Sequence, residues 1–199
     1  DISPQYRIRA TQLIRSNRPN MLTYVPFSSI LETSNLKLHE CIMPGSGRKL
    51  PKKKRDSLLI TSGTGGEITP SYKRFVESLA HQGKGPFTTV FVEPDLLPEV
   101  KPSWMVAAEF NANMFSRSLV AICRPGMGIV SDCIESSIIM FLVFESGNLE
   151  MRSNSNALEM HGIGYTFDSC QAAFNAAENW VSDGEFEEFD DLFTCSTAD

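Results

Sequence analysis

The segment from Cys123 to Asp132 combines residue types that suit the binding of an anion. Its sequence is CRPGMGIVSD, in which a permanent cation, Arg124, precedes two glycines and an apolar run. The pattern predicts a turn that leads into a helix, whose free backbone N–H groups and dipole attract negative charge. We therefore expect the guanidinium and the backbone N–H groups to hold a diphosphate together. Asp132 either accepts hydrogen bonds from a ribose diol or stabilises the first turn of the helix.

A second glycine-rich segment, Ser62 to Gly66, follows the apolar run Leu58 to Ile60. Glycines remove side-chain bulk from a turn, so that phosphate oxygens or another stretch of backbone can come close. A tight turn without a ligand explains this segment equally well. Neither glycine segment matches the dinucleotide fingerprint or the phosphate loop of ATP-binding proteins, which disfavours nicotinamide and ATP chemistry.

Both segments lie at the ends of apolar runs that alternate with amphipathic stretches of helical length. The runs are apolar throughout rather than at every second residue, which is typical of strands buried on both faces. Strands of this kind separated by helices predict an α/β fold, a doubly wound parallel sheet. The expected strands are 58–60, 87–92, 104–108, 119–122 and 138–144, and the expected helices are 70–82, 113–117, 129–137, 154–161 and 171–181.

The composition changes along the chain and predicts four parts. Residues 1–44 contain short apolar stretches and several prolines, and we interpret them as the tail end of an N-terminal domain or an extension. Residues 45–56 are rich in Pro, Gly and basic side chains, which is typical of a solvated linker. Residues 57–185 hold the α/β domain, and residues 186–199 form an acidic C-terminal tail.

Charge and cysteine content restrict the class of protein further. The formal net charge of −6 disfavours a nucleic-acid-binding protein that depends on neutralising phosphates. The five cysteines are odd in number and contain no Cys-x-x-Cys pair, so they indicate neither a disulfide framework nor a zinc site. No apolar run approaches the length of a membrane helix. We expect a cytoplasmic protein.

Three segments in order resemble one known family. They are the glycine loop from Ser62 to Gly66, the segment from Cys123 to Asp132, and the stretch from Gly147 to Gly164. Residues 58–184 thereby resemble the C-terminal, nucleotide-sugar-binding domain of GT-B glycosyltransferases. The pattern is close to that of the bacterial cell-wall UDP-N-acetylglucosamine transferase and of macrolide-type glycosyltransferases. The resemblance implies a Rossmann-like domain that binds a UDP-sugar as donor substrate and needs neither a metal nor a cofactor.

The resemblance also assigns roles to individual residues. The backbone near Phe110 and Asn111 would hold the base, and Glu150 and Met151 would face the hydroxyls of the donor sugar. The general base would belong to an N-terminal acceptor domain, for which residues 1–44 are too short, so an acceptor domain or subunit is the expected partner. The full set of expected donor-binding residues is Ser62, Gly63, Thr64, Gly65, Phe110, Asn111, Arg124, Gly126, Met127, Gly128, Ile129, Asp132, Glu150 and Met151.

Two residues depart from the family pattern. Met151 stands where relatives often have an amide side chain, which removes a hydrogen-bond donor and an acceptor for the sugar. Arg124 stands where many relatives have a histidine, and it keeps a positive charge there permanently. The identity of the sugar is therefore left open, whereas diphosphate binding is expected.

Other functions fit the same residues. The chain could be a non-catalytic nucleotide-sugar-binding module or a split subunit that acts only with a partner. It could also be a nucleotide-sugar epimerase or hydrolase of the same architecture, or a structural domain in which the glycines only allow tight turns. The basic run 48–55 suits a flexible linker, a peripheral contact with anionic lipid or a nuclear signal.

Overall fold

The computed structural model describes residues 20–24, 37–41, 55–63 and 66–184 of the 199-residue chain. The chain divides into two units, Asp1–Met43 and Pro44–Asp199. In the first unit, strands β1 (Asn20–Tyr24) and β2 (Lys37–Cys41) pair in parallel. The second unit contains the other described residues and the candidate site.

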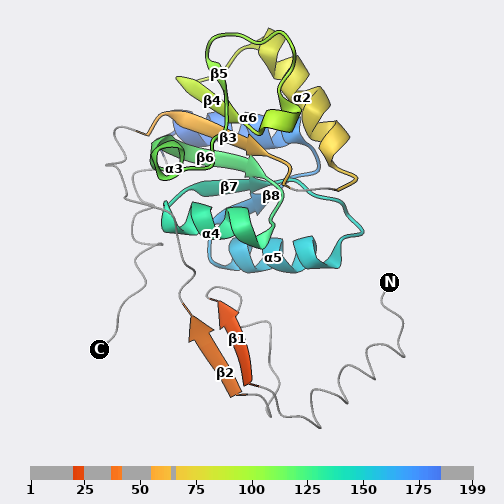
Figure 1. Ribbon diagram of the computed structural model, residues 1–199, viewed down its shortest axis with the longest axis vertical. Coiled ribbons are helices and arrows are strands. Elements are labelled where there is room, and N and C mark those ends of the chain that lie inside the picture. Colours follow the sequence, from red (N-terminus) through yellow and green to blue (C-terminus); the bar gives the residue numbers. More distant parts are fainter. Residues whose placement is uncertain (1–19, 25–36, 42–54, 64–65, 185–199) are drawn as a thin grey trace. The chain divides into compact units, whose positions relative to one another are not determined.

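The second unit is built on a six-stranded sheet with the strand order β5-β4-β3-β6-β7-β8 (Figure 1). Every neighbouring pair is parallel. The chain builds outward from β3 to β5, returns to the other side of β3 as β6, and then builds outward to β8. This order confirms the predicted α/β class with a doubly wound sheet. The strands are β3 (Ser57–Thr61), β4 (Thr89–Val92), β5 (Met105–Ala107), β6 (Ser118–Cys123), β7 (Ile139–Leu142) and β8 (Gly164–Thr166).

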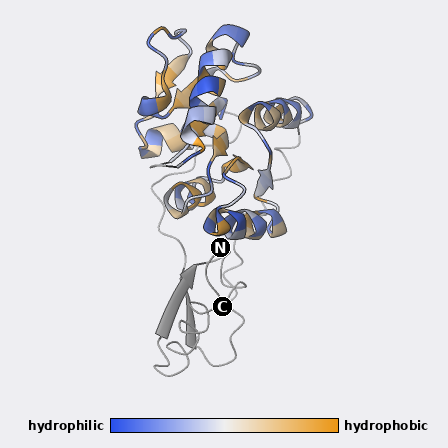
Figure 2. Cartoon of the chain, turned by 90° about the vertical axis from the view of Figure 1, so that its right-hand side faces the viewer, coloured by the Kyte–Doolittle hydropathy of each residue, from blue (hydrophilic) through white to orange (hydrophobic). Residues whose placement is uncertain are grey.

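Helices cover both faces of the sheet, with α4 and α5 on one face and α2 and α6 on the other (Figure 1). Helices α2 and α6 meet through the rings of Phe75 and Phe174, whose centroids are 5.9 Å apart. The helices carry both hydrophobic and hydrophilic stretches in Figure 2, as expected for helices with one face on a core. Their bounds are α2 (Thr69–Gln82), α3 (Ala112–Arg117), α4 (Met127–Glu135), α5 (Leu149–Met160) and α6 (Cys170–Ser182), with a 3-10 helix, η3 (Pro94–Leu96).

The central strands are buried along their whole length. All residues of β3, β6 and β7 are buried, which explains why their sequences show no polar alternation. Helix α2 begins with a proline in its first turn and buries Tyr72, Phe75, Val76 and Leu79 at helical spacing. The continuous apolar pattern and the helical pattern therefore predicted these elements correctly.

Most helix and strand bounds lie within two residues of the predicted ones, and three features differ further. Helix α5 begins at Leu149 rather than Asn154, because the side chain of Asn148 accepts a hydrogen bond from the Met151 N–H and caps the helix there. Strand β8 was not predicted, since it is three residues long and includes a glycine. Arg55, at the end of the range predicted to be a solvated linker, is instead buried and donates to the carbonyl oxygens of Ser136 and Ser137.

Some predictions lie outside the described residues. These are the site residues Thr64 and Gly65, most of the basic run 48–55, and the acidic tail 186–199. Among the helices of the described ranges, none has the length and apolar character needed to cross a membrane.

Candidate functional site

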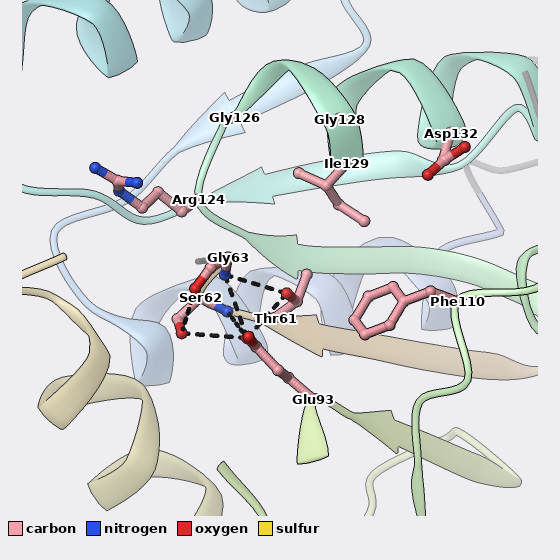
Figure 3. Close-up of a pocket in the computed structure, with 10 residues that line it drawn as sticks. All are labelled: Thr61, Ser62, Gly63, Glu93, Phe110, Arg124, Gly126, Gly128, Ile129 and Asp132. Atoms are coloured by element: carbon pink, nitrogen blue, oxygen red, sulfur yellow. Dashed lines mark hydrogen bonds between the residues drawn. The ribbon is translucent and has the colours of Figure 1, made fainter. Parts of the chain in front are cut away.

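The candidate site lies at the carboxyl ends of β3 and β6. These neighbouring strands mark the point where the strand order reverses, and open α/β sheets bind ligands there. A cavity of about 340 Å³ opens at this point, which is within the range of small-molecule sites. Its lining residues are Thr61, Ser62, Gly63, Glu93, Phe110, Arg124, Gly126, Gly128, Ile129 and Asp132 (Figure 3).

One wall of the cavity is the amino end of α4. Gly126 occupies the N-cap position, and no side chain of the described residues caps the helix with a hydrogen bond there. The first backbone N–H groups of an α-helix have no partner within the helix, so those of α4 are directed out of its amino end. The preceding turn is fixed from α5, where the buried Asn154 donates through Nδ2 to the Pro125 carbonyl oxygen at 2.8 Å. A turn followed by a helix is present as predicted, but α4 begins at Met127, two residues before the predicted start at residue 129.

The two glycines of this wall are not required by the fold. Gly126 has a φ of −77°, a value open to any residue. Apart from the neighbouring residues and the backbone of α4 itself, a Cβ atom added to Gly126 or to Gly128 would meet no atom of the described residues within 4 Å. Alanine would also favour the helix at Gly128. Neither backbone conformation nor packing within the protein therefore explains why these positions lack side chains.

Arg124 lies at one end of the cavity and pairs with a carboxylate. Its Nε donates to Oε2 of Glu145 at 2.9 Å, and both side chains are largely buried. In Figure 3 the guanidinium points away from Phe110 and Asp132, which lie toward the other end. Burial acts to raise the pKa of Glu145, but hydrogen bonds from its own backbone N–H and from Arg124 outweigh it and hold that pKa below its usual value.

A second cavity, of about 640 Å³, also borders Arg124. Its wall includes residues 145–148, which follow β7, and residues 66–68, which precede α2. The backbone of Ile68, at the N-cap of α2, is among the groups that lower the pKa of Glu145. Glu145 thus places negative charge both beside Arg124 and at the amino end of α2, which the helix dipole favours.

The loop that follows β3 already holds a carboxylate oxygen. Oε2 of Glu93 accepts hydrogen bonds from the N–H of Ser62 at 2.7 Å and the N–H of Gly63 at 3.2 Å. The same oxygen accepts from the hydroxyl groups of Thr61 at 3.0 Å and Ser62 at 3.2 Å (Figure 3). The expected phosphate-binding loop therefore lines the cavity, but its donors at these three residues are engaged by the protein itself.

The glycines at this loop have reasons within the fold. Gly63 has a φ of +71°, in the left-handed region that favours glycine. Gly66 has a φ of +151°, and a Cβ atom there would lie 2.5 Å from Oε1 of Glu145. Both positions are explained without a ligand.

Of four further expected residues, two line the cavity and two, Asn111 and Met127, do not. Phe110 and Asp132 line the cavity, and Phe110 is 41% exposed with a φ of +46°. Asn111 is not among the lining residues, and its side chain instead caps α3 by accepting from the Met114 N–H at 2.9 Å. The base-binding role expected for residues 110 and 111 therefore fits only Phe110 by position.

Glu150 and Met151, which the resemblance assigns to the donor sugar, lie in a helix. Both lie in the first turn of α5 rather than in a loop, because Asn148 caps the helix. Met151 is 3% exposed, and neither residue lines either cavity. The Met151 side chain packs in the core, and the contact of both residues with a donor sugar stays a prediction.

Residues that the sequence analysis missed include Thr61 and Glu93, which line the first cavity, and Glu145, which lines the second. Each lies at or just beyond the carboxyl end of a strand, at β3, β4 and β7 respectively. The sequence signal that could have found them is a polar residue at or soon after the end of each apolar run. Such residues gather at one edge of the sheet, because parallel strands end there. No group of three or more metal-ligating side chains forms among the residues that the structure describes.

No protein-family model matches this chain, and no curated protein matches it in sequence. The fold itself is that of a known class: a Rossmann-like α/β domain of the kind that forms half of a GT-B glycosyltransferase. The predicted resemblance in fold is thereby confirmed.

Three solved structures show this similarity. The calicheamicin glycosyltransferase CalG4 has a TM-score of 0.59 at 12% identity, over 96% of this chain and 54% of its own. The spinosyn forosaminyltransferase SpnP has a TM-score of 0.53 at 16% identity, over 84% and 50%. The glycotransferase of kitacinnamycin has a TM-score of 0.52 at 15% identity, over 74% and 40%. The chain thus spans about half the length of these proteins.

Proposed function

We propose that the α/β domain binds the diphosphate of a nucleotide sugar, with a UDP-sugar as the first candidate, at the amino end of α4. The observation that carries this proposal is the pair Gly126 and Gly128, whose missing side chains nothing in the fold requires. The space they leave lies directly over free helix N–H groups, where an anion is stabilised. Arg124 borders the same cavity and supplies a cation.

The lining residues suggest how the ligand lies. With its diphosphate over α4, the nucleoside would extend toward Asp132 and Phe110, away from Arg124. The ribose hydroxyls could then donate to the Asp132 carboxylate, and the base could pack on the exposed Phe110 ring. The sugar would extend past Arg124 into the cavity bordered by residues 145–148.

The reaction that this arrangement would assist is glycosyl transfer. The bond between the anomeric carbon and the diphosphate oxygen breaks, a new bond forms to an acceptor oxygen, and the acceptor's proton passes to a base. We place that base in an acceptor domain or subunit outside the described residues. The domain's own contribution would be electrostatic, because the α4 N–H groups and Arg124 stabilise the negative charge of the departing diphosphate.

Calorimetric titration with UDP, TDP and GDP tests this proposal. We expect UDP to bind, and Arg124→Ala to weaken binding by about 1.5–3 kcal/mol, the scale of a hydrogen bond to a charged group. Arg74→Ala is the matched control, because Arg74 is an exposed arginine of α2 that borders neither cavity at the site. Equal UDP affinity for the wild type and Arg124→Ala would contradict the role of Arg124, and no binding of any nucleotide would refute the proposal.

A second candidate is a nucleotide-sugar-binding module that becomes active only with a partner. This candidate is favoured because the chain matches only 40–54% of the length of each similar transferase. This candidate predicts donor binding by the chain alone, with turnover of a UDP-sugar only after an acceptor domain or subunit is added. Turnover by the chain alone would exclude it.

A further inference from the structure

Glu93 places one carboxylate oxygen at the centre of four donors. Two are the consecutive backbone N–H groups of Ser62 and Gly63, and two are the hydroxyl groups of Thr61 and Ser62, at 2.7–3.2 Å. The donors belong to the end of β3, whereas Glu93 directly follows the neighbouring strand β4. The contact therefore depends on the pairing of the two strands.

Such a set of donors suits an oxyanion in general. Consecutive backbone N–H groups form a concave site for anions, and carboxylate and phosphate oxygens accept hydrogen bonds from it alike. The loop also faces the cavity that α4 borders, so a phosphate could reach it if it were empty. A site of this kind exists at the end of β3, and the oxyanion that occupies it belongs to the chain.

We propose that Glu93 is a built-in anion that closes the Thr61–Gly63 loop to phosphate and thereby restricts the ligand's diphosphate to the amino end of α4. The proposal rests on the proposed function for the identity of that ligand. Without Glu93 the cavity would offer two anion sites on neighbouring strands, and a diphosphate could bind in two positions. Glu93 is thus a positioning residue, which acts by excluding the ligand from one of these sites.

The test uses the full chain and inorganic phosphate as the probe. Phosphate is titrated by calorimetry into Arg124→Ala, in which the α4 site is weakened, and into Arg124→Ala/Glu93→Ala. We expect the double variant to bind phosphate about tenfold or more tightly than the single variant, because four donors become available. No gain in affinity would overturn the proposal.

Glu93→Gln is the matched control on the same background. The glutamine amide is as large as the carboxylate, and its oxygen can accept the same hydrogen bonds, so we expect no gain in phosphate affinity. A gain equal to that of Glu93→Ala would overturn the proposal, because it would show that charge repulsion, rather than occupancy of the donors, excludes phosphate.

The stability of the variants gives an independent measurement. Removing Glu93 takes away the acceptor that four donors share, and only the Gly63 N–H and the Ser62 hydroxyl keep a second acceptor, in Thr61 Oγ1 and the Gly63 carbonyl oxygen. Glu93→Ala should therefore melt at a lower temperature than the wild type and should regain stability as phosphate is added. If this variant fails to fold, refolding in phosphate should rescue it, and a failure of rescue would overturn the proposal. Because the probe is not a nucleotide, an absence of UDP binding would refute the proposed function and leave this test valid.

Discussion

Two glycine-containing loops meet at the point where the strand order reverses, and they differ in what satisfies their donors. At the end of β3, the N–H groups of Ser62 and Gly63 bind the Glu93 carboxylate. At the start of α4, no side chain from the described part of the chain caps the helix. The glycines differ in the same way, since those near β3 are explained by positive φ or close packing and those of α4 are not.

This comparison shows how a glycine loop that can bind an anion differs from one whose hydrogen-bond donors are already paired within the protein. Both loops have glycines after a buried strand, so the residue types alone suggest the same chemistry for each. The distinguishing property is whether the protein supplies its own acceptor. A loop whose donors are already paired is stabilised by that pairing, whereas an unpaired helix end in a cavity is available to a ligand.

The largest expected effect comes from giving α4 the carboxylate that the β3 loop has. Gly126→Asp places an acceptor at the N-cap, where its side chain can accept from the N–H two or three residues later. We expect UDP affinity to fall about a hundredfold, since the carboxylate occupies the site and repels the diphosphate. Calorimetry measures this loss.

The stability of Gly126→Asp sharpens the result. An aspartate at an N-cap stabilises a helix as well as glycine or slightly better, so the thermal midpoint should stay the same or rise. Gly126→Ala is the control without the added charge: a Cβ atom there has room in the protein but takes up part of the space assigned to the diphosphate, so UDP affinity should fall clearly less than in Gly126→Asp. Full UDP binding by Gly126→Asp would mean that the ligand does not use the amino end of α4.

An intermediate effect is expected from Asn154→Ala, which removes the hydrogen bond to the Pro125 carbonyl. That buried contact fixes the turn before α4, so its loss should lower the free energy of unfolding by about 1–3 kcal/mol. We expect UDP affinity to fall about tenfold as the turn loosens. Asn156→Ala is the control, because Asn156 is exposed on the same helix. Urea denaturation and calorimetry measure the two effects, and unchanged values for both would contradict the role of Asn154.

The smallest effect is expected from Glu145→Gln. Removing the charge releases Arg124 from its ion pair, so UDP affinity should rise about threefold. The pKa of Glu145 in the folded protein lies below its usual value. The ion pair therefore contributes stability above the usual pKa of a glutamate and loses it as the pH falls through the lowered value.

The lowered pKa of Glu145 determines how the stability of the protein depends on pH. The wild type should be more stable than Glu145→Gln by about 1 kcal/mol at neutral pH. The difference should disappear in strongly acidic solution, where the wild-type carboxyl is protonated. Thermal unfolding of both proteins across this range measures it. A difference that grows toward acidic pH would show that the pairing of Glu145 with Arg124 is not what stabilises the wild type.

The sequence by itself determined the fold class and singled out two glycine-containing segments that line the candidate cavity. Apolar runs such as 119–122 and 138–144 are continuous because both faces of these strands are buried, and this local pattern can be recognised along the chain. The helix start at Gly126 is likewise a local signal. Strand β8 was missed because its three residues are too few to show such a local pattern.

Only the tertiary structure decided which of the two loops is open. Glu93 lies about thirty residues from the loop that it fills, and Glu145 lies twenty-one residues from the arginine that it pairs with. These carboxylates meet their donors because parallel strands end at one edge of the sheet. Strand pairing sets such contacts between distant residues, and spacing along the chain does not record them.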